Sequence, residues 1–134
     1  MAERLPEPAR TLLESPNVAH LATLMADGTP HVTPVWVDVE DSIVLVNSAE
    51  GRVKVSNLRR DPRVGLSVAD RENPHAAVSI RGRVLEITEA GGEEHIDALA
   101  RKYLGAERYP MRRAGERRLV IRIEPVHVFG PSSE

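Results

Sequence analysis

The strongest constraint on the fold is a series of six β-type runs that follow one another closely along the chain. These runs are rich in Val, Ile, Leu and Thr, and they span residues 18–25, 31–39, 42–48, 63–69, 77–88 and 117–129. Most of them are joined by short turns, and the repeating strand–helix–strand order of a doubly wound fold is missing. Antiparallel strands at this spacing favour closure into a barrel. We therefore expect a mainly β (α+β) domain built on six antiparallel strands.

Turn and breaker residues refine this expectation. Asp27-Gly28 separates the first two runs and predicts a tight hairpin in which both turn residues have positive φ. Pro34 cannot donate a ladder hydrogen bond, so it marks an edge, a bulge or a strand end. Gly82, inside the long fifth run, predicts a bulge or bend. Helical spacing and stop signals predict two or three short helices, at 6–15, 52–60 and 91–104.

Composition narrows the class of protein. A chain of 134 residues suits a single domain over 1–134, and we expect residues 131–134 to be a frayed tail. Aromatic residues are 3% of the chain, so the core must be aliphatic, and such a thin core is compatible with association with a second chain. There is no cysteine, which excludes disulfides and thiolate metal sites.

Charge and hydropathy bear on partners and location. The net charge is -2, which disfavours a basic nucleic-acid binder. No apolar run approaches the roughly 20 residues needed to cross a membrane. The first ten residues carry acids and prolines where a signal peptide would have a basic start and an apolar stretch. We expect a cytoplasmic protein that does not bind membranes or nucleic acids.

Positive charge is concentrated between residues 50 and 63. This segment has five bases (Arg52, Lys54, Arg59, Arg60 and Arg63) and two acids (Glu50 and Asp61), a balance of 5 - 2 = +3. It follows a strand-like run and begins a predicted helix, and N–H groups at a helix start bind anions. Arg52 and Lys54 lie nearest the strand end and are the best candidates to hold a phosphate. A solvated basic helix explains the composition equally well.

The neighbouring TPVWV stretch adds an apolar element. Pro34 leaves nearby peptide groups without ladder partners, and Trp36 is the only tryptophan. A planar heterocycle lying on this strand would account for both features. On pattern alone, packing of Trp36 in the core or a dimer interface is the stronger interpretation.

Other chemical templates are absent from the sequence. No GxGxxG follows a strand and no Walker A motif exists. The serines have no nucleophile-elbow context. The histidines never fall at metal-ligand spacing, so no metal site is expected; they are His20, His31, His75, His95 and His127.

Four segments together resemble a known family. They are VAHLATLMADGTPHVTPVWV, LVNSAEGRVKVSNLRRDPRVGLSV, VSIRGRV and VHVFG, in this order between about Leu13 and Gly130. They resemble the pyridoxamine 5′-phosphate oxidase-like split β-barrel proteins, and most of all the F420-dependent branch of the flavin/deazaflavin oxidoreductases. The resemblance implies a six-stranded Greek-key split barrel that forms a homodimer, with two cofactor sites in grooves between the subunits.

The same resemblance assigns site residues but no catalytic side chain. It implies that Arg52 and Lys54 hold the cofactor phosphate. Asn47, Ser48 and Asn57 would lie near that phosphate. The ring system would be lined by Thr33, Pro34, Val35 and Trp36, and Ser79 and Arg81 would approach from the partner subunit.

Two departures from the family pattern stand out. His75, Ala76 and Ala77 replace an aromatic pair that relatives often carry before the fifth run, which weakens any aromatic substrate contact there and widens the expected pocket. The chain also lacks the C-terminal extension with which pyridoxamine phosphate oxidases complete their substrate site, which weakens a vitamin B6 role.

The preferred hypothesis is an F420H2-dependent reductase. Reduced F420 would deliver a hydride to an electron-poor conjugated molecule such as an enone, a quinone or a tetrapyrrole, with the proton coming from solvent. The basic cluster Arg108, Arg112, Arg113, Arg117 and Arg118 could contact the anionic F420 tail, although a solvated loop is the stronger interpretation. Alternatives are an FMN flavoprotein, a non-catalytic cofactor carrier and a haem-binding barrel, with nucleic-acid binding a weak fourth.

Overall fold

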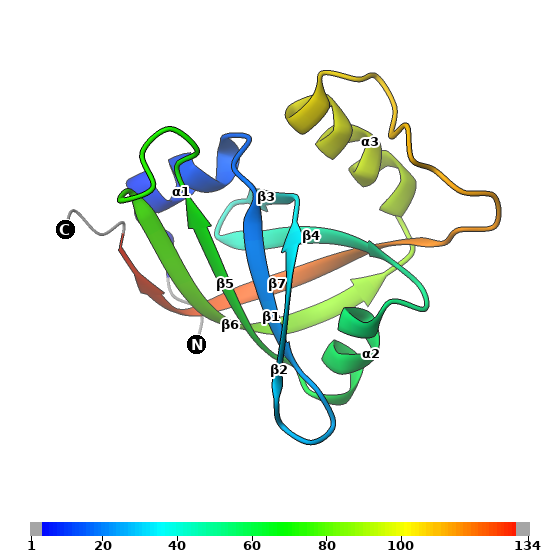
Figure 1. Ribbon diagram of the computed structural model, residues 1–134, viewed down its shortest axis with the longest axis horizontal. Coiled ribbons are helices and arrows are strands. Elements are labelled where there is room, and N and C mark those ends of the chain that lie inside the picture. Colours follow the sequence, from blue (N-terminus) through cyan, green and yellow to red (C-terminus); the bar gives the residue numbers. More distant parts are fainter. Residues whose placement is uncertain (1–3, 131–134) are drawn as a thin grey trace.

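The computed structural model describes residues 4–130, which form seven strands and three helices. The strands make one antiparallel sheet that curls around an aliphatic core (Figure 1). In chain order the elements are α1 (Glu7–Glu14), β1 (Ala19–Leu24), β2 (Pro30–Val35), β3 (Val37–Glu40), β4 (Ile43–Ala49), α2 (Val53–Arg60), β5 (Arg63–Ala69), β6 (Ala77–Thr88), α3 (Gly92–Leu104) and β7 (Arg118–Phe129). The expected tail at 131–134 lies outside the described residues.

The expectation of six strands is wrong, because the run 31–39 forms two strands. β2 ends at Val35, β3 begins at Val37, and Trp36 alone connects them. The two strands pair with different partners: β2 with β1, and β3 with β4. In the sheet order β2-β1-β5-β6-β7-β4-β3 they occupy opposite edges. Since one residue joins the two edges, the sheet has to curl until they meet.

The turn signals are partly confirmed. Pro34 lies on an edge strand and Gly82 lies at a register shift between β6 and β7, as expected. The hairpin after β1 differs from the prediction, because only Gly28 has positive φ, at +87°, and Asp27 does not. The N–H of Gly28 donates to the carbonyl of Met25 and the N–H of Met25 donates to the carbonyl of Thr29. The loop therefore has three residues, and a loop of that length needs one left-handed residue.

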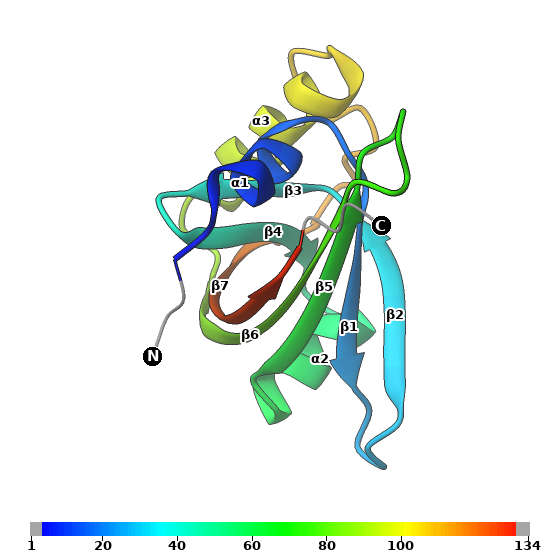
Figure 2. The ribbon, with the colours of Figure 1, turned by 90° about the vertical axis from the view of Figure 1, so that its left-hand side faces the viewer.

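The helices cover the ends of the curled sheet. Figure 2 shows α1 and α3 toward one end and α2 toward the other. α1 buries Ala9, Leu12 and Leu13, and the fully buried part of the core contains no aromatic residue within 4–130. No helix within the described residues is long and apolar enough to span a bilayer.

Two side chains of α3 tie it to the crossover between β2 and β3. The ammonium of Lys102 donates to the carbonyls of Leu13 and Val37, both at 2.6 Å. The hydroxyl of Tyr103 donates to the carbonyl of Asn17 at 2.7 Å and accepts the N–H of Val37 at 3.0 Å. Burial, the main cause, raises the pKa of Tyr103 to about 12, so this hydroxyl stays neutral and can donate. α3 thus holds the point at which the chain changes edges.

The opposite end of α3 rests on β7 through a glycine. A Cβ on Gly92 would overlap the backbone carbonyl of Arg118. At Gly65, which lies on the sheet, a Cβ would meet Ala22 Cβ at an ordinary 3.7 Å. Of these two positions, only Gly92 requires the absence of a side chain for its packing.

We predict that Gly92→Ala lowers the free energy of unfolding by about 1–3 kcal/mol or more, since backbone has to move to admit the methyl group. Gly65→Ala, the matched control, should be neutral or stabilise by up to about 1 kcal/mol. Urea unfolding of both variants at one protein concentration measures the difference. Equal stabilities would show that α3 is not held at this distance by Gly92.

Candidate functional site

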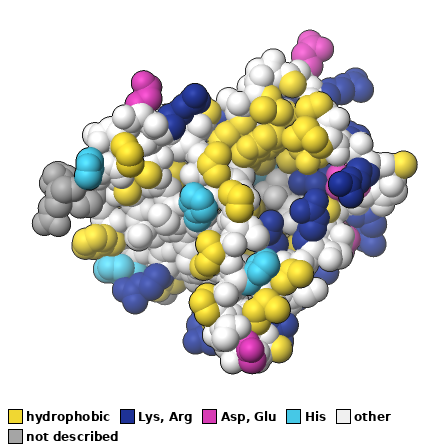
Figure 3. All heavy atoms as spheres, viewed as in Figure 1, with side chains coloured by type: hydrophobic (Ala, Val, Ile, Leu, Met, Phe, Trp, Pro, Cys, Tyr) yellow, Lys and Arg dark blue, Asp and Glu magenta, His cyan; other side chains and the backbone are white. Residues whose placement is uncertain are grey.

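A pocket of about 330 Å³ lies where the β2–β3 crossover, the end of β4, the start of α2 and the loop between α3 and β7 meet. Its lining residues are Val18, Pro34, Val35, Trp36, Asn47, Ser48, Arg52, Lys54, Ile96, Tyr109, Met111 and Arg118. Figure 3 shows this recess with Lys and Arg side chains gathered at one side and apolar side chains bordering it. The two kinds of side chain divide the pocket into a cationic part and an apolar part.

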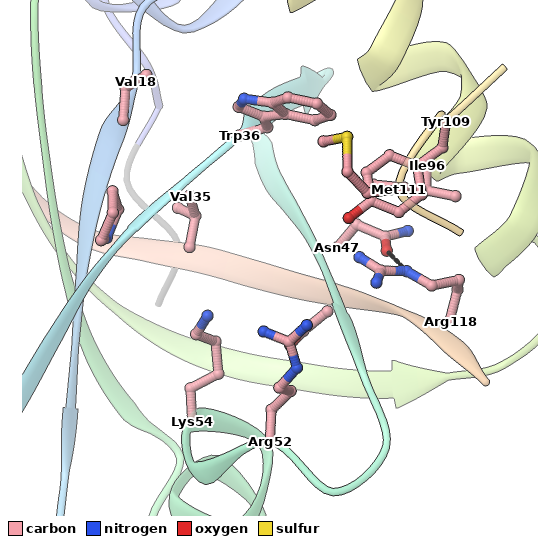
Figure 4. Close-up of a pocket in the computed structure, with 12 residues that line it drawn as sticks. Val18, Val35, Trp36, Asn47, Arg52, Lys54, Ile96, Tyr109, Met111 and Arg118 are labelled. Atoms are coloured by element: carbon pink, nitrogen blue, oxygen red, sulfur yellow. Dashed lines mark hydrogen bonds between the residues drawn. The ribbon is translucent and has the colours of Figure 1, made fainter. Parts of the chain in front are cut away.

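The cationic part comes from Arg52, Lys54 and Arg118. Figure 4 shows their charged ends turned toward one space, below Trp36 and Tyr109. No carboxylate lines the pocket. Burial lowers the pKa of Lys54, and the nearby charges of Arg52 and Arg118 lower it further. An anion in this space would relieve the mutual repulsion of the three cations.

The local fold explains why two of these cations point into the pocket. β4 ends at Ala49, and the chain turns at Gly51, which has a φ of +91° that favours glycine. α2 then begins, with Arg52 at its N-cap and no side-chain cap bond. The first-turn N–H groups of a helix are unsatisfied donors that favour an anion, so the helix start adds to the charge of Arg52 and Lys54.

The other bases of this segment have partners elsewhere. Arg59 makes two bonds to Glu50, at 2.8 and 2.6 Å, and Arg63 pairs with Asp61 at 2.8 Å. Arg60 donates to the carbonyl of Leu24. These three follow the interpretation of an ordinary charged helix surface. Arg52 and Lys54 do not, because neither side chain makes a hydrogen bond or ion pair within residues 4–130.

Two polar residues at the end of β4 complete the cationic part. Asn47 is 8% exposed, and its Oδ1 accepts the Nε–H of Arg118 at 2.9 Å. Ser48 is 3% exposed, and its hydroxyl has no hydrogen-bond partner among the described residues. A buried hydroxyl left unpaired costs free energy, about 1–3 kcal/mol. Because Ser48 lines the pocket, a ligand oxygen there would satisfy it.

The apolar part is organised around Trp36. Its ring stacks on Tyr103 with centroids 5.2 Å apart and planes 10° apart. Tyr109 meets it edge-on at 6.0 Å. Trp36 thus packs on two aromatic rings of its own chain, half-buried and outside the aliphatic core, and also lines the pocket. The result is a rigid wall suited to a planar ring.

The remaining residues assigned by resemblance lie apart from this pocket. Thr33 is half-buried on β2 and does not line it. Asn57 is 2% exposed, and its amide donates to the hydroxyl of Thr23 at 3.0 Å, which ties α2 to β1. Ser79 and Arg81 are exposed on β6, and Arg81 lines a separate groove with Arg63 and Arg83.

Five lining residues were not assigned to the site from sequence: Val18, Ile96, Tyr109, Met111 and Arg118. Tyr109 and Met111 lie in the loop between α3 and β7. Apolar side chains in an otherwise polar loop are a signal that could have found them. Arg118 belonged to the basic cluster that we interpreted as solvated, yet it is 5% exposed.

The rest of that cluster follows the solvated interpretation. Arg112 pairs with Glu93 and with Asp97, and Arg117 pairs with Glu89 at 2.8 Å. Arg108 and Arg113 are exposed. Arg118 differs because it begins β7, a central strand, where its side chain is enclosed by Asn47 and Tyr109.

Comparison with known proteins places the chain in a family. The family model described as pyridoxamine 5′-phosphate oxidase matches residues 5–130. An F420H(2)-dependent biliverdin reductase of Mycobacterium tuberculosis (strain CDC 1551 / Oshkosh) is 32% identical over 130 residues, covering 95% of this chain and 88% of that protein.

Solved structures show the same fold. A structure titled F420 reductase is 30% identical, with a TM-score of 0.83 over 93% of this chain and 98% of that one. A putative pyridoxamine 5′-phosphate oxidase from Lactobacillus delbrueckii is 25% identical, with a TM-score of 0.67 over 95% of this chain and 94% of that one. The split barrel, with seven strands here, is therefore the fold of this chain.

Proposed function

The chain belongs to the pyridoxamine 5′-phosphate oxidase family, and on that premise we propose that it is an F420-dependent oxidoreductase acting on a small conjugated organic substrate. The observation that carries the proposal is the two-part pocket, in which three cations and an unpaired buried hydroxyl face an aromatic wall. Similarity to an F420H(2)-dependent biliverdin reductase at 32% identity and to an F420 reductase at 30% identity supports the choice of F420. A cytoplasmic location remains part of the proposal.

In this proposal the protein binds and orients the cofactor. Arg52, Lys54 and the first turn of α2 hold the phosphate, and the hydroxyl of Ser48 donates to one of its oxygens. Pro34, Val35 and Trp36 provide the surface for the ring system. When bound, the deazaflavin supplies the hydride chemistry. The residues outside the pocket, Thr33 and Asn57, act by supporting β2 and α2.

We assign no side chain of the pocket as a catalytic acid or nucleophile. No carboxylate, cysteine or histidine lines it. Its cations are fitted to charge neutralisation, and the neighbouring Tyr103 hydroxyl is engaged with Asn17 and Val37. In the favoured reductase direction the substrate gains a hydride, and a proton from solvent completes the reduction.

FMN binding is the second candidate function. The observation that favours it is the match to pyridoxamine 5′-phosphate oxidases, both as a family model and as a structure 25% identical. The same cations would hold the FMN phosphate, since the proposed contacts involve only the phosphate and the ring system of the cofactor. A carrier without turnover would use identical contacts.

We also propose that the protein is a homodimer whose cofactor sites lie between the subunits. The outer face of β2, β1, β5, β6 and β7 supports it. Val32 and Phe129 are 57% and 65% exposed there, around a groove of about 440 Å³ that Ala22 and Gly65 help to line. Apolar side chains exposed on one face of a sheet suit contact with a second copy. Ser79 and Arg81 lie on β6 of this sheet and would reach the partner's site.

We expect the purified protein to bind F420 more tightly than FMN when each is titrated and cofactor fluorescence is followed. Preference for FMN, or a yellow protein with FMN already bound, would favour the flavoprotein. Binding of neither would remove the case for redox function. If F420 binds, turnover with F420H2 and a panel of conjugated acceptors would separate an enzyme from a carrier.

Removing both helix-start cations should weaken cofactor binding. For Arg52→Ala with Lys54→Ala we expect the Kd to rise by at least tenfold, because a charge-assisted hydrogen bond contributes about 1.5–3 kcal/mol. The fold should survive, since neither side chain has a bonded partner in the described chain. Arg59→Ala, which removes a cation paired with Glu50 and lining neither the pocket nor the proposed dimer groove, is the control. An unchanged Kd in the double variant would show that the phosphate lies elsewhere.

The proposed dimer predicts a solution mass twice the chain mass of 14.8 kDa. Light scattering after size exclusion measures it. Val32→Glu should shift the protein to the monomer mass while the circular dichroism spectrum stays the same, because a charge would be buried between the subunits. A monomeric parent protein at micromolar concentration would contradict the dimer.

A further inference from the structure

Asn47 lies at the centre of a buried network that joins the pocket to α3. Its amide nitrogen donates to the carbonyl of Gly92 at 3.0 Å and lies 3.1 Å from Nδ1 of His95. Its carbonyl oxygen accepts the Nε–H of Arg118 at 2.9 Å, the bond drawn dashed in Figure 4. Two of these three neighbours can play only one role in a hydrogen bond.

Those two neighbours determine how the amide is oriented. A guanidinium only donates, so the Asn47 atom facing Arg118 is the oxygen. A peptide carbonyl only accepts, so the atom facing Gly92 is the nitrogen. The same NH2 group faces His95, whose Nδ1 must therefore accept. This assigns His95 as neutral, with its proton on Nε2, and Nε2 has no partner among the described residues.

Arg118 has spare hydrogen-bonding capacity. It is 5% exposed, with its guanidinium 5.1 Å from the Tyr109 ring centroid. It forms an ion pair with Glu116 at 3.2 Å, but Glu116 Oε1 accepts no hydrogen bond. Within residues 4–130 the only hydrogen bond of its side chain is the one from Nε to Asn47. A nearly buried cation that lines a pocket with unused donors is equipped to bind an anionic group.

We propose that Arg118 is a third anion-binding residue of the cofactor pocket, and that neutral His95 is a positioning residue that acts through Asn47 to hold Arg118 there. This inference rests on the proposed function, since it adds to the same pocket. Arg118 lies across the pocket from the start of α2, so it binds a second anionic group or the far side of the phosphate. His95 contacts neither the phosphate nor a second anionic group.

The network has a consequence for pH. Protonated His95 would present an N–H to the NH2 group of Asn47, so two donors would meet. Turning the amide over would satisfy His95, but it would break the bond to Gly92 and leave Arg118 facing an NH2 group. Anion binding through Arg118 therefore weakens when His95 is protonated.

The charges around His95 give the direction of this effect. Burial is the largest influence and lowers its pKa; Arg122 on β7 and Lys102 on α3 lower it further, whereas Asp38 and Glu40 on β3 raise it. His95 is then neutral at pH 7 and becomes protonated only below its ordinary pKa of 6.5. Affinity should be constant above that pH and fall at lower pH.

The first test needs no cofactor. The ¹⁵Nε–Hε signal of Arg118 is followed by NMR between pH 8 and pH 5 in the free protein. We expect it to shift with the same midpoint as the ring signals of His95. In His95→Asn, whose side-chain oxygen replaces Nδ1 as an acceptor without titrating, the shift should vanish. An Arg118 Nε–H chemical shift that does not change as His95 titrates would overturn the coupling.

The second test measures binding, with F420 and inorganic phosphate as probes. At each pH the Kd of the wild type is divided by the Kd of His95→Asn, so that titration of the probe itself cancels. We expect this ratio to rise by about tenfold or more between pH 7.5 and a pH below the His95 midpoint. His95→Leu should bind weakly at every pH. That loss should disappear in an Arg118→Met background, because His95 then has nothing to position.

These arms separate this inference from the proposed function. Failure of F420 to bind removes the function, but the NMR shift and the phosphate titration still decide the role of His95. A loss in His95→Leu that is equal with and without Arg118 means that His95 only supports the fold, and it overturns the inference. An Arg118→Met variant that binds both probes like wild type overturns the assignment of Arg118.

Discussion

The single-residue crossing at Trp36 is the constraint on which the rest of this structure depends. β2 and β3 lie at opposite edges of a seven-stranded sheet, and one residue joins them. The sheet therefore has to curl, and its aliphatic side becomes the interior. The crossing is held from outside by α3, through the Lys102 and Tyr103 bonds to Val37 and the stacking of Tyr103 on Trp36. Backbone groups that lose ladder partners where the strand breaks are thus bonded to side chains, as buried polar groups require.

The pocket is a direct result of that crossing. A strand that changes edges leaves a gap between the end of β2 and the end of β4, and α2 begins beside it. Three cations then line a space that no carboxylate lines, and of the three only Arg118 has an ion-pair partner in the described chain, Glu116. The buried hydroxyl of Ser48 has no hydrogen-bond partner there. Both features raise the free energy of the empty pocket, and an anion bearing hydrogen-bond acceptors lowers it. Binding a phosphorylated ring compound is the role that this chemistry favours.

α3 contributes to the site in ways that its position in the sequence does not reveal. Its first residue packs against the Arg118 backbone with no room for a side chain, and its fourth residue, His95, lies against Asn47. The loop that follows brings Tyr109 and Met111 over the pocket. Asp97 anchors this loop by accepting the N–H of Tyr109 at 2.9 Å. The helix therefore connects the crossover, the cations of the pocket and the apolar wall in one packed unit.

The sequence by itself determined the local elements. Alternation and turn residues located β5 and β6 to the residue and the helices to within a residue or two. The charge pattern singled out Arg52 and Lys54, because a helix start after a strand is a local feature. The break at Trp36, the burial of Arg118 and the Asn47 network required the tertiary structure. Each depends on which distant strands pair: β3 leaves β2 because β4 offers it a partner, and Arg118 is buried because its strand lies between β4 and β6. Such pairings are set by the closing of the whole sheet, which no local pattern encodes.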